Sequence, residues 1–225
     1  MLDYRMTLRD ARDIEAATAV QHGAPAVGVK VRFAPDGAVD GLQFTAALVA
    51  DSPLQPFVPA IRSGIAAAMQ DGRGGIPFTG VRAELVFGWA SGVAANDAAF
   101  ARAAWIALGC AAEGNRVLLE PMTALEVEVP LPCAADVVND LTMRWPAARP
   151  DTAPGEAGWI RVSAQVPTAE LTDYGAILAA LSQGKGRLAS RSAGHRRAAA
   201  RTLLAVLAER DAFGSIRGGR DGAAP

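Results

Sequence analysis

Three carboxylates fall within the stretch GNRVLLEPMTALEVEVPLP, residues 114–132. Glu126 and Glu128 are two residues apart, so on a β-strand their side chains would share one face. A carboxylate pair of this kind can divide acid and base roles in a reaction. Such a pair is more often the solvated face of a half-buried strand, and nothing buried or cationic stands beside it in the sequence. We therefore predict a strand here, with the two glutamates outside and Leu125, Val127 and Val129 inside.

Glu120 differs from the other two because it stands directly before Pro121. A residue before proline is pushed toward extended geometry, and the proline removes one backbone donor from regular pairing. We predict that Glu120 and Pro121 are inter-domain residues, at a boundary between two folding units. A cation would then hold Glu120 and keep the two units in register.

Other constellations that could do chemistry are incomplete. His22 and His195 have no carboxylate or cysteine companion in the sequence, so neither a triad nor a metal cluster can be assembled. Cys110 and Cys133 form no CxxC pair, and SQGKGR (residues 182–187) precedes a strand pattern, whereas a phosphate loop opens a helix. The sequence predicts no catalytic residue, no metal and no cofactor, and hence a protein that is not an enzyme.

Charge is distributed unevenly along the 225 residues, although the formal net charge is only -1. Residues 1–183 hold 13 Lys and Arg against 20 Asp and Glu, whereas residues 184–225 hold 9 against 3. The basic end could contact an anion such as RNA, or it could be a solvated tail. The sequence contains no apolar run of about 18 residues, so we expect no membrane span. The first ten residues lack a signal-peptide pattern. We expect a cytoplasmic protein with no membrane partner.

The first half of the chain alternates between strand and helix patterns. Residues 1–19 are polar with weak helical character. Residues 27–33 and 42–50 alternate with period 2 and are expected to pair as a hairpin. Residues 57–70 have helical spacing, and residues 81–87 alternate again, with Val81, Ala83, Leu85 and Phe87 predicted inward. Asn96 is predicted to cap a second helix.

The second half predicts the order β-α-β-β-α-β, which is the ferredoxin-like arrangement. Its strands are expected at residues 125–129, 147–149, 159–167 and after Gly186, with helices at 134–145 and from Thr168. A basic helix is predicted from His195 to Arg210, followed by a flexible tail. Lys185, Arg187 and Arg191 lie on or beside the last strand, where they could bind RNA phosphates or could discourage edge pairing. Aromatic side chains for base stacking are not evident there.

Six segments follow one another along the chain: FVPAIRSGIAAAMQDG, GIPFTGVRAELVFG, NDAAFARAAWIAL, VLLEPMTALEVEVP, DVVNDL and VPTAELTDYGAILAALSQGKGRL. In this order they resemble the C-terminal half of translation elongation factor G and the related ribosomal-protection factors. The combination of LLEPM with SQGKG at the family's distance is specific. The resemblance covers about residues 27–188.

The resemblance implies an α+β fold with two small domains and a C-terminal helix. Residues 1–118 would form an α/β domain like ribosomal protein S5, which is domain IV of the factor. Residues 119–194 would form domain V, a ferredoxin-like βαββαβ sandwich, and residues 195–225 the basic helix and tail. In the family, the domain IV tip enters the decoding centre, and domain V lies near the stalk base and the sarcin–ricin loop. The family's GTPase domain is not recognised in the sequence.

The resemblance also implies which residues meet the ribosome. Two tip loops, residues 21–28 and 88–95, would contact rRNA, and the basic edge would add phosphate contacts. The predicted tip contacts are Gln21, His22, Gly28, Lys30, Trp89, Ala90, Ser91 and Gly92, and the predicted edge contacts are Lys185, Arg187 and Arg191. Ser91 stands where the family usually has histidine, and the first tip loop has no arginine.

Two functions follow from this pattern. The first is a non-catalytic, ribosome- or rRNA-associated protein that acts in or around translation elongation. The second is a repurposed protein-binding module that contacts a separate partner, such as a separately encoded GTPase, with no role on the ribosome. The acidic balance of residues 1–183 favours the second, because it opposes rRNA phosphate.

Overall fold

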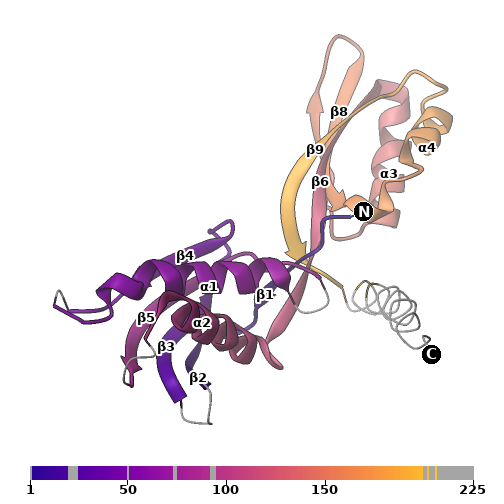
Figure 1. Cartoon of the computed structure of the whole chain (residues 1–225). Coiled ribbons are helices and arrows are strands. Elements are labelled where there is room, and N and C mark those ends of the chain that lie inside the picture. The colour runs from indigo at the N-terminus through magenta and orange to yellow at the C-terminus, as the bar shows by residue number, and fades with distance from the viewer. Residues whose placement is uncertain are drawn as a thin grey trace, which may run out of the picture. The chain divides into compact units, whose positions relative to one another are not determined.

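The computed structural model describes residues 2–19, 25–49, 51–72, 75–91, 95–199, 202 and 206 (Figure 1). The chain divides into two compact units. The first unit contains Tyr4–Leu118 and Ala198–Pro225, and the second contains Met1–Asp3 and Leu119–Arg197. Each unit has its own hydrophobic core.

The first unit is a four-stranded sheet with two helices on one face (Figure 1). Its strands run in the order β2-β3-β5-β4, with β4 parallel to β5 and the other pairs antiparallel. The sheet contains β2 (Arg12–Ala19), β3 (Pro25–Pro35), β4 (Leu42–Ala46) and β5 (Val81–Ala90). The helices are α1 (Val58–Asp71), which a short 3-10 turn at Gln55–Phe57 precedes, and α2 (Asp97–Ala112).

Period-2 alternation places the core of the first unit on one side of the sheet. Val27, Val29, Val31 and Phe33 are completely buried, while Lys30 and Arg32 between them are exposed. The helices close this side with Ile61, Ile65 and Phe100, which are also completely buried. Neither α1 nor α2 covers the opposite face, so its side chains are open to solvent. Asn96 caps α2 as predicted, since its side chain accepts a hydrogen bond from the Ala99 amide.

The predicted hairpin between residues 27–33 and 42–50 is wrong. β3 pairs with β2 and β5, and β4 lies at the edge of the sheet beside β5. The segment after β4 forms α1 and returns as β5, so the parallel pair β4–β5 is joined by a helical crossover. β5 is thereby inserted between the two strands that the alternation had suggested as partners.

The N-terminal segment is extended and not helical, which corrects the expectation for residues 1–19. β1 (Arg5–Leu8) pairs with β6, and β2 forms the edge of the four-stranded sheet. Met6 and Leu8 are buried in the core of the first unit. Backbone hydrogen bonds link Met6 with Pro77 and Thr79. The segment is polar because each of its strands has one solvent-exposed face. Its weak helical periodicity was misleading.

The helices α1 and α2 are in close backbone contact at Gly64. A Cβ atom at Gly64 would lie 2.1 Å from the Ala101 carbonyl oxygen. Gly64 therefore permits backbone contact that any larger residue would prevent. Gly109 of α2 offers a matched comparison, because a Cβ there would meet nothing within 4 Å.

We expect Gly64→Ala to lower the free energy of unfolding by at least about 2 kcal/mol, because the helices must separate to admit the methyl group. Gly109→Ala should instead raise it by about 0.5–1 kcal/mol through helix propensity. Urea denaturation followed by circular dichroism measures both changes. Equal effects of the two substitutions would contradict the close contact at Gly64.

The second unit is built on the ferredoxin-like sheet order β9-β6-β8-β7, which confirms the predicted fold. Its strands are β6 (Arg116–Pro130), β7 (Asp151–Pro154), β8 (Trp159–Pro167) and β9 (Arg187–Arg197). α3 (Ala134–Arg144) and α4 (Tyr174–Leu181) lie on one side of this sheet (Figure 1). Short 3-10 turns, Leu131–Cys133 and Thr168–Glu170, precede these helices.

The core of the second unit lies between the sheet and its two helices. Leu125, Val127 and Val129 are buried as predicted, and Glu126 and Glu128 are only partly buried on the other face. Helices α3 and α4 complete the core; its buried side chains are Leu125, Val127, Val129, Val137, Leu141, Trp145, Val162, Ala164, Val166, Tyr174 and Leu178. Because α3 and α4 cover one side only, they leave the other sheet face open.

Two boundaries in the second half differ from expectation. The second strand lies at Asp151–Pro154, because Arg149 takes a positive φ of 44° and turns the chain where residues 147–149 were predicted to be extended. Thr168 begins a 3-10 turn, and α4 starts only at Tyr174.

The predicted helix from His195 is also wrong at its start. β9 continues through Arg197, since its last residues pair with β6 as far as Leu119. Thr202 and Val206 are helical and Val206 is buried. The predicted flexible tail lies outside the described residues.

Tyr174 is buried beneath α3 with its ring 5.4 Å from that of Trp145. The Trp145 indole N–H donates to Glu170 at 2.6 Å, whereas the Tyr174 hydroxyl has no hydrogen-bond partner within the described residues. Burial raises the pKa of Tyr174 to about 12, and the nearby Asp140 carboxylate adds to the rise while Arg144 opposes it.

This raised pKa predicts a loss of stability at alkaline pH. In the unfolded chain Tyr174 ionises near pH 10, while the folded protein keeps its proton to about pH 12, so stability falls by about 2–3 kcal/mol across that window. Tyr174→Phe should abolish the part of the alkaline loss of stability that ionisation of Tyr174 causes. Urea denaturation of both proteins at about pH 9, 10.5 and 11.5 measures it, and parallel pH profiles would contradict the prediction.

Candidate nucleic-acid interface

The predicted tip residues that the structure describes lie mainly in strands. Gly28 belongs to β3, and Trp89 and Ala90 belong to β5, where loops had been expected, whereas Lys30 lies in β3 within the predicted strand. Ser91 follows β5 directly. Gln21, His22 and Gly92 lie outside the described residues. The strands extend farther than predicted, since β3 begins at Pro25 and β5 continues to Ala90.

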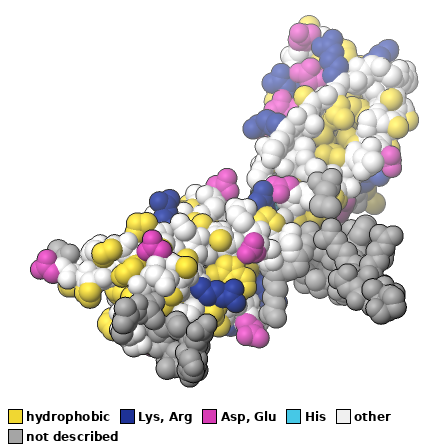
Figure 2. Space-filling view, viewed as in Figure 1, with side chains coloured by type: hydrophobic (Ala, Val, Ile, Leu, Met, Phe, Trp, Pro, Cys, Tyr) yellow, Lys and Arg dark blue, Asp and Glu magenta, His cyan; other side chains and the backbone are white. Residues whose placement is uncertain are grey.

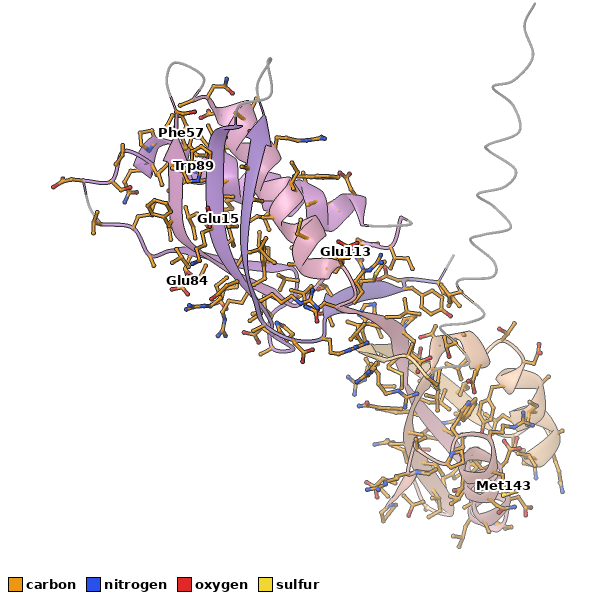
Figure 3. The ribbon with its side chains drawn as sticks, turned by 90° about the horizontal axis from the view of Figure 1, so that it is seen from below. Glu15, Phe57, Glu84, Trp89, Glu113 and Met143 are labelled. Atoms are coloured by element: carbon orange, nitrogen blue, oxygen red, sulfur yellow. The ribbon has the colours of Figure 1, made fainter. Side chains whose placement is uncertain are left out.

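Strand pairing brings these residues together on the open face of the first unit. Gly28 pairs with Trp89, and Lys30 pairs with Phe87. A Cβ atom at Gly28 would lie 2.5 Å from the Trp89 indole nitrogen. The indole ring therefore packs directly on the β3 backbone at Gly28, where the side chain of any other residue would clash with it. Figure 3 shows Trp89 toward one end of this sheet, with Glu84 farther along it.

Phe87 is part of this surface, although the sequence pattern placed it in the core. Its side chain is 54% exposed. The pairing of β3 with β5 shifts register between Lys30 and Val31, so two residues of β5 oppose one of β3. Such a bulge reverses the inside–outside order beyond it. Strict period-2 alternation along β5 does not predict this reversal.

Most charges on the same face neutralise each other. Arg32 donates to Asp13 at 2.9 Å and lies 3.3 Å from a Glu84 oxygen. The hydrogen bond and charge of Asp13, followed by the charge of Glu84, raise the pKa of Arg32 above its ordinary value. Lys30 makes no ion pair or hydrogen bond within the part of the chain that the structure describes. Lys30, Phe87 and Trp89 therefore form a small surface with one available cation and two aromatic rings.

The predicted basic edge of the second unit is partly neutralised as well. The Arg187 guanidinium stacks over Trp159 at 4.9 Å from the ring centre, and one of its nitrogens lies 3.9 Å from Glu128. Arg161 donates to the same carboxylate at 2.9 Å. This interleaving is visible in Figure 2, where positive and negative side chains alternate along the strands of the second unit. Trp159 was not predicted as an aromatic neighbour of the basic edge, because it lies on a different strand.

The other two edge residues are less engaged. Arg191 lies on β9 opposite Ala124 and is exposed, and Lys185 is exposed in the turn between α4 and β9. Neither side chain makes an ion pair among the described residues. The turn itself is closed by Ser182, whose hydroxyl accepts from the Gly186 amide at 2.8 Å.

Glu120 is buried and meets a cation, but that cation comes from the same unit. Its carboxylate accepts from Arg196 of β9 at 3.0 Å, and only 5% of the Glu120 side chain is exposed. The pairing of β6 with β9 shifts register between Pro121 and Thr123, as expected where a proline interrupts the ladder. The inter-domain role of Glu120 and Pro121 remains a prediction.

Glu120→Ala should lower the free energy of unfolding by about 1–3 kcal/mol, because it leaves Arg196 without its carboxylate. Glu126→Ala is a matched control on the same strand, where the carboxylate makes no ion pair with the described residues, and should change it by less than about 0.5 kcal/mol. Hydrogen exchange should quicken at the Arg196 and Arg197 amides in the first variant only. Unchanged exchange there would contradict the role of this ion pair.

Other kinds of site find little support in the described part of the chain. No group of three or more His, Cys, Asp or Glu is arranged to hold a metal ion among the described residues. Cys110 is exposed and Cys133 half-buried, and both are free. Within the described ranges, no helix is long and apolar enough to cross a bilayer.

An S5-like α/β unit followed by a ferredoxin-like sandwich defines this protein as a relative of the ribosomal translation factors. The family model for elongation factor G, domain IV, matches residues 3–114, and the model for the elongation factor G C-terminus matches residues 117–204. The chain belongs to the elongation factor G family. Both matched models describe non-catalytic parts of that factor.

A solved structure has a similar fold over nearly the whole chain. The crystal structure of ttk003000868 from Thermus thermophilus is 27% identical in sequence and superposes with a TM-score of 0.76. The match covers 94% of this chain and 32% of that protein. This chain thus spans about a third of the length of its structural relative.

Proposed function

We propose that this protein is a non-catalytic translation-factor module that binds the ribosome through rRNA and acts in or around elongation. The ordered match to domain IV and to the C-terminal domain of elongation factor G carries the proposal. In the family, both domains contact the ribosome. The proposal assigns no catalytic step to this chain, since the matched domains are the non-catalytic ones.

Two surfaces are proposed to make the rRNA contacts. The first combines the predicted tip residues with Lys30 and the aromatic pair Phe87 and Trp89, whose rings can stack on unpaired bases. The second is the basic edge, where Lys185 and Arg191 are available and Arg187 is held by Trp159. The acidic balance of residues 1–183 confines favourable phosphate contact to such local surfaces.

Co-sedimentation with purified 70S ribosomes tests this function. The wild-type chain should pellet with ribosomes at about 50 mM salt and be released at several hundred millimolar, as phosphate contacts are screened. Lys185→Gln combined with Arg187→Gln should reduce pelleting, because two basic groups at the edge are removed. Arg9→Gln combined with Arg62→Gln makes the same charge change at exposed positions elsewhere and should have little effect. No pelleting of the wild-type chain at low salt would refute ribosome binding.

A protein partner, such as a separately encoded GTPase, is the second candidate. The observation that favours it is an apolar hollow of about 530 Å³ beside the C-terminal halves of α1 and α2, lined by Phe78, Trp105, Ile106 and the exposed Cys110 among others. Hydrophobic side chains also gather over these helices in Figure 2. If affinity purification recovers ribosomal proteins and no other specific partner, this second function is refuted.

A further inference from the structure

The open face of the second unit contains a hollow of about 680 Å³. This volume lies within the range of pockets that hold small ligands, about 300–1,000 Å³. The hollow follows from the sheet itself. Ala124 at its floor is flanked by Gln165 on β8 and Arg191 on β9, its two partners in register. A small side chain between two long ones leaves a depression. At one end of it β9 has one more residue than β6 between the pairs Pro121–His195 and Thr123–Ser192, and this bulge bends β9.

Two arginines enter this hollow from opposite edges of the sheet. Arg191 belongs to the edge strand β9, and Arg149 stands just before the other edge strand, β7. Three strand spacings separate these edges, about 14 Å. Arg149 adopts the left-handed backbone region, with φ of 44°, immediately before Pro150. That conformation is costly for a side chain other than glycine, and strain of this kind concentrates at binding sites.

Most polar groups of the hollow are not used within the described part of the protein; the exceptions are His195, whose ring nitrogen lies 2.8 Å from the Asp3 carbonyl oxygen, and Arg196, which is paired with Glu120. Arg149, Arg191, Glu126, Ser163 and Gln165 line it. None of these five side chains makes a hydrogen bond or ion pair with another described residue. Farther along the same sheet face, by contrast, Arg161, Glu128 and Arg187 satisfy one another.

This set of groups selects a ligand with both anionic and hydrogen-bonding parts. Arginine guanidinium groups bind phosphate and also stack on nucleobases. Glu126 would repel a bare phosphate, but its carboxylate accepts hydrogen bonds from a ribose hydroxyl or an exocyclic amine. Gln165 can both donate to and accept from a base edge. A ribonucleotide supplies each of these partners in one unit.

We propose that this hollow binds one unpaired ribonucleotide, with its phosphate at Arg149 or Arg191 and its sugar or base at Glu126 and Gln165. A single-stranded RNA or a free nucleotide can supply that unit. The assignment to RNA rests on the proposed ribosome-binding function. The architecture agrees with it, since single-stranded RNA is bound on the open face of four-stranded βαββαβ sheets in the RRM class of domains.

Fluorescence anisotropy with a labelled single-stranded RNA hexamer of mixed sequence tests the site on the full-length chain. The combined change Arg149→Gln and Arg191→Gln should weaken binding at least about tenfold through loss of phosphate contacts. Ala124→Leu should weaken it comparably by filling the floor, with no change in charge. The exposed pair Arg9→Gln and Arg62→Gln controls for charge and should leave affinity within about twofold, as expected for remote surface changes.

The direction in which Glu126→Gln changes the affinity for RNA decides whether Glu126 contributes to binding. If Glu126 binds ribonucleotide donors, this variant binds RNA more weakly. If the face attracts only phosphate, removing the negative charge strengthens binding, and that result would overturn the proposal. Competition with adenosine monophosphate distinguishes the two sources of ligand: equal affinities for the mononucleotide and the hexamer identify a free nucleotide, and tighter hexamer binding identifies RNA.

The ribosome experiment separates this proposal from the proposed function. If the chain pellets with ribosomes but the pocket variants bind the hexamer as the wild type does, the pocket assignment fails and the function stands. If hexamer binding depends on the pocket but the chain does not pellet, the pocket stands and the ribosomal function fails. Circular dichroism of each variant confirms that it is folded.

Discussion

Burial of each sheet on one face only is the constraint from which the other features of this protein follow. In β6, Leu125, Val127 and Val129 pack beneath α3 and α4, which obliges Glu126 and Glu128 to face outward. In β3, Val29 and Val31 do the same beneath α1 and α2 and turn Lys30 and Arg32 outward. Because these helices cover only one side of each sheet, every residue of alternate parity becomes available for ion pairs or for a ligand.

Local irregularities then decide what the open faces present. The bulge opposite Lys30 turns Phe87 outward beside the indole that lies on Gly28. The register shift beside Pro121 is a bulge of β9, which bends that strand next to the hollow over Ala124. Bulges are common beside functional sites because they redirect a side chain without abandoning the sheet. In both units, the candidate RNA surface lies next to such a bulge.

Charge pairing divides the polar residues of these faces into two kinds. Arg32, Arg161 and Arg187 are committed to carboxylates on adjacent strands, and exposed pairs of this sort add little stability. Lys30, Arg149 and Arg191 have no such partner within the described residues. The total charge of the chain is therefore a poor guide to the proposed RNA contacts, and the placement of the few cations without an ion pair among the described residues is a better one.

The sequence alone determined most of the elements and the family. Period-2 patterns identified β3, β5, β6 and β8, helical spacing identified α1 to α3, and the ordered motifs from FVPAIRSG to SQGKG identified elongation factor G. These signals are local, because alternation and capping depend on residues that are close in the chain. The carboxylates Glu126 and Glu128 were correctly placed outside a strand for the same reason.

Only the tertiary structure decided which strands are neighbours and which side chains meet. It inserted β5 between β3 and β4, turned residues 5–19 into strands, and exposed Phe87. It also paired Glu120 with Arg196, 76 residues away, and brought Arg149 and Arg191 to one hollow. Register, bulges and long-range charge pairs depend on which segments fold against each other, and a one-residue shift reverses every face beyond it. The alternation of residues along one strand does not indicate which strand becomes its neighbour or in which register the two pair.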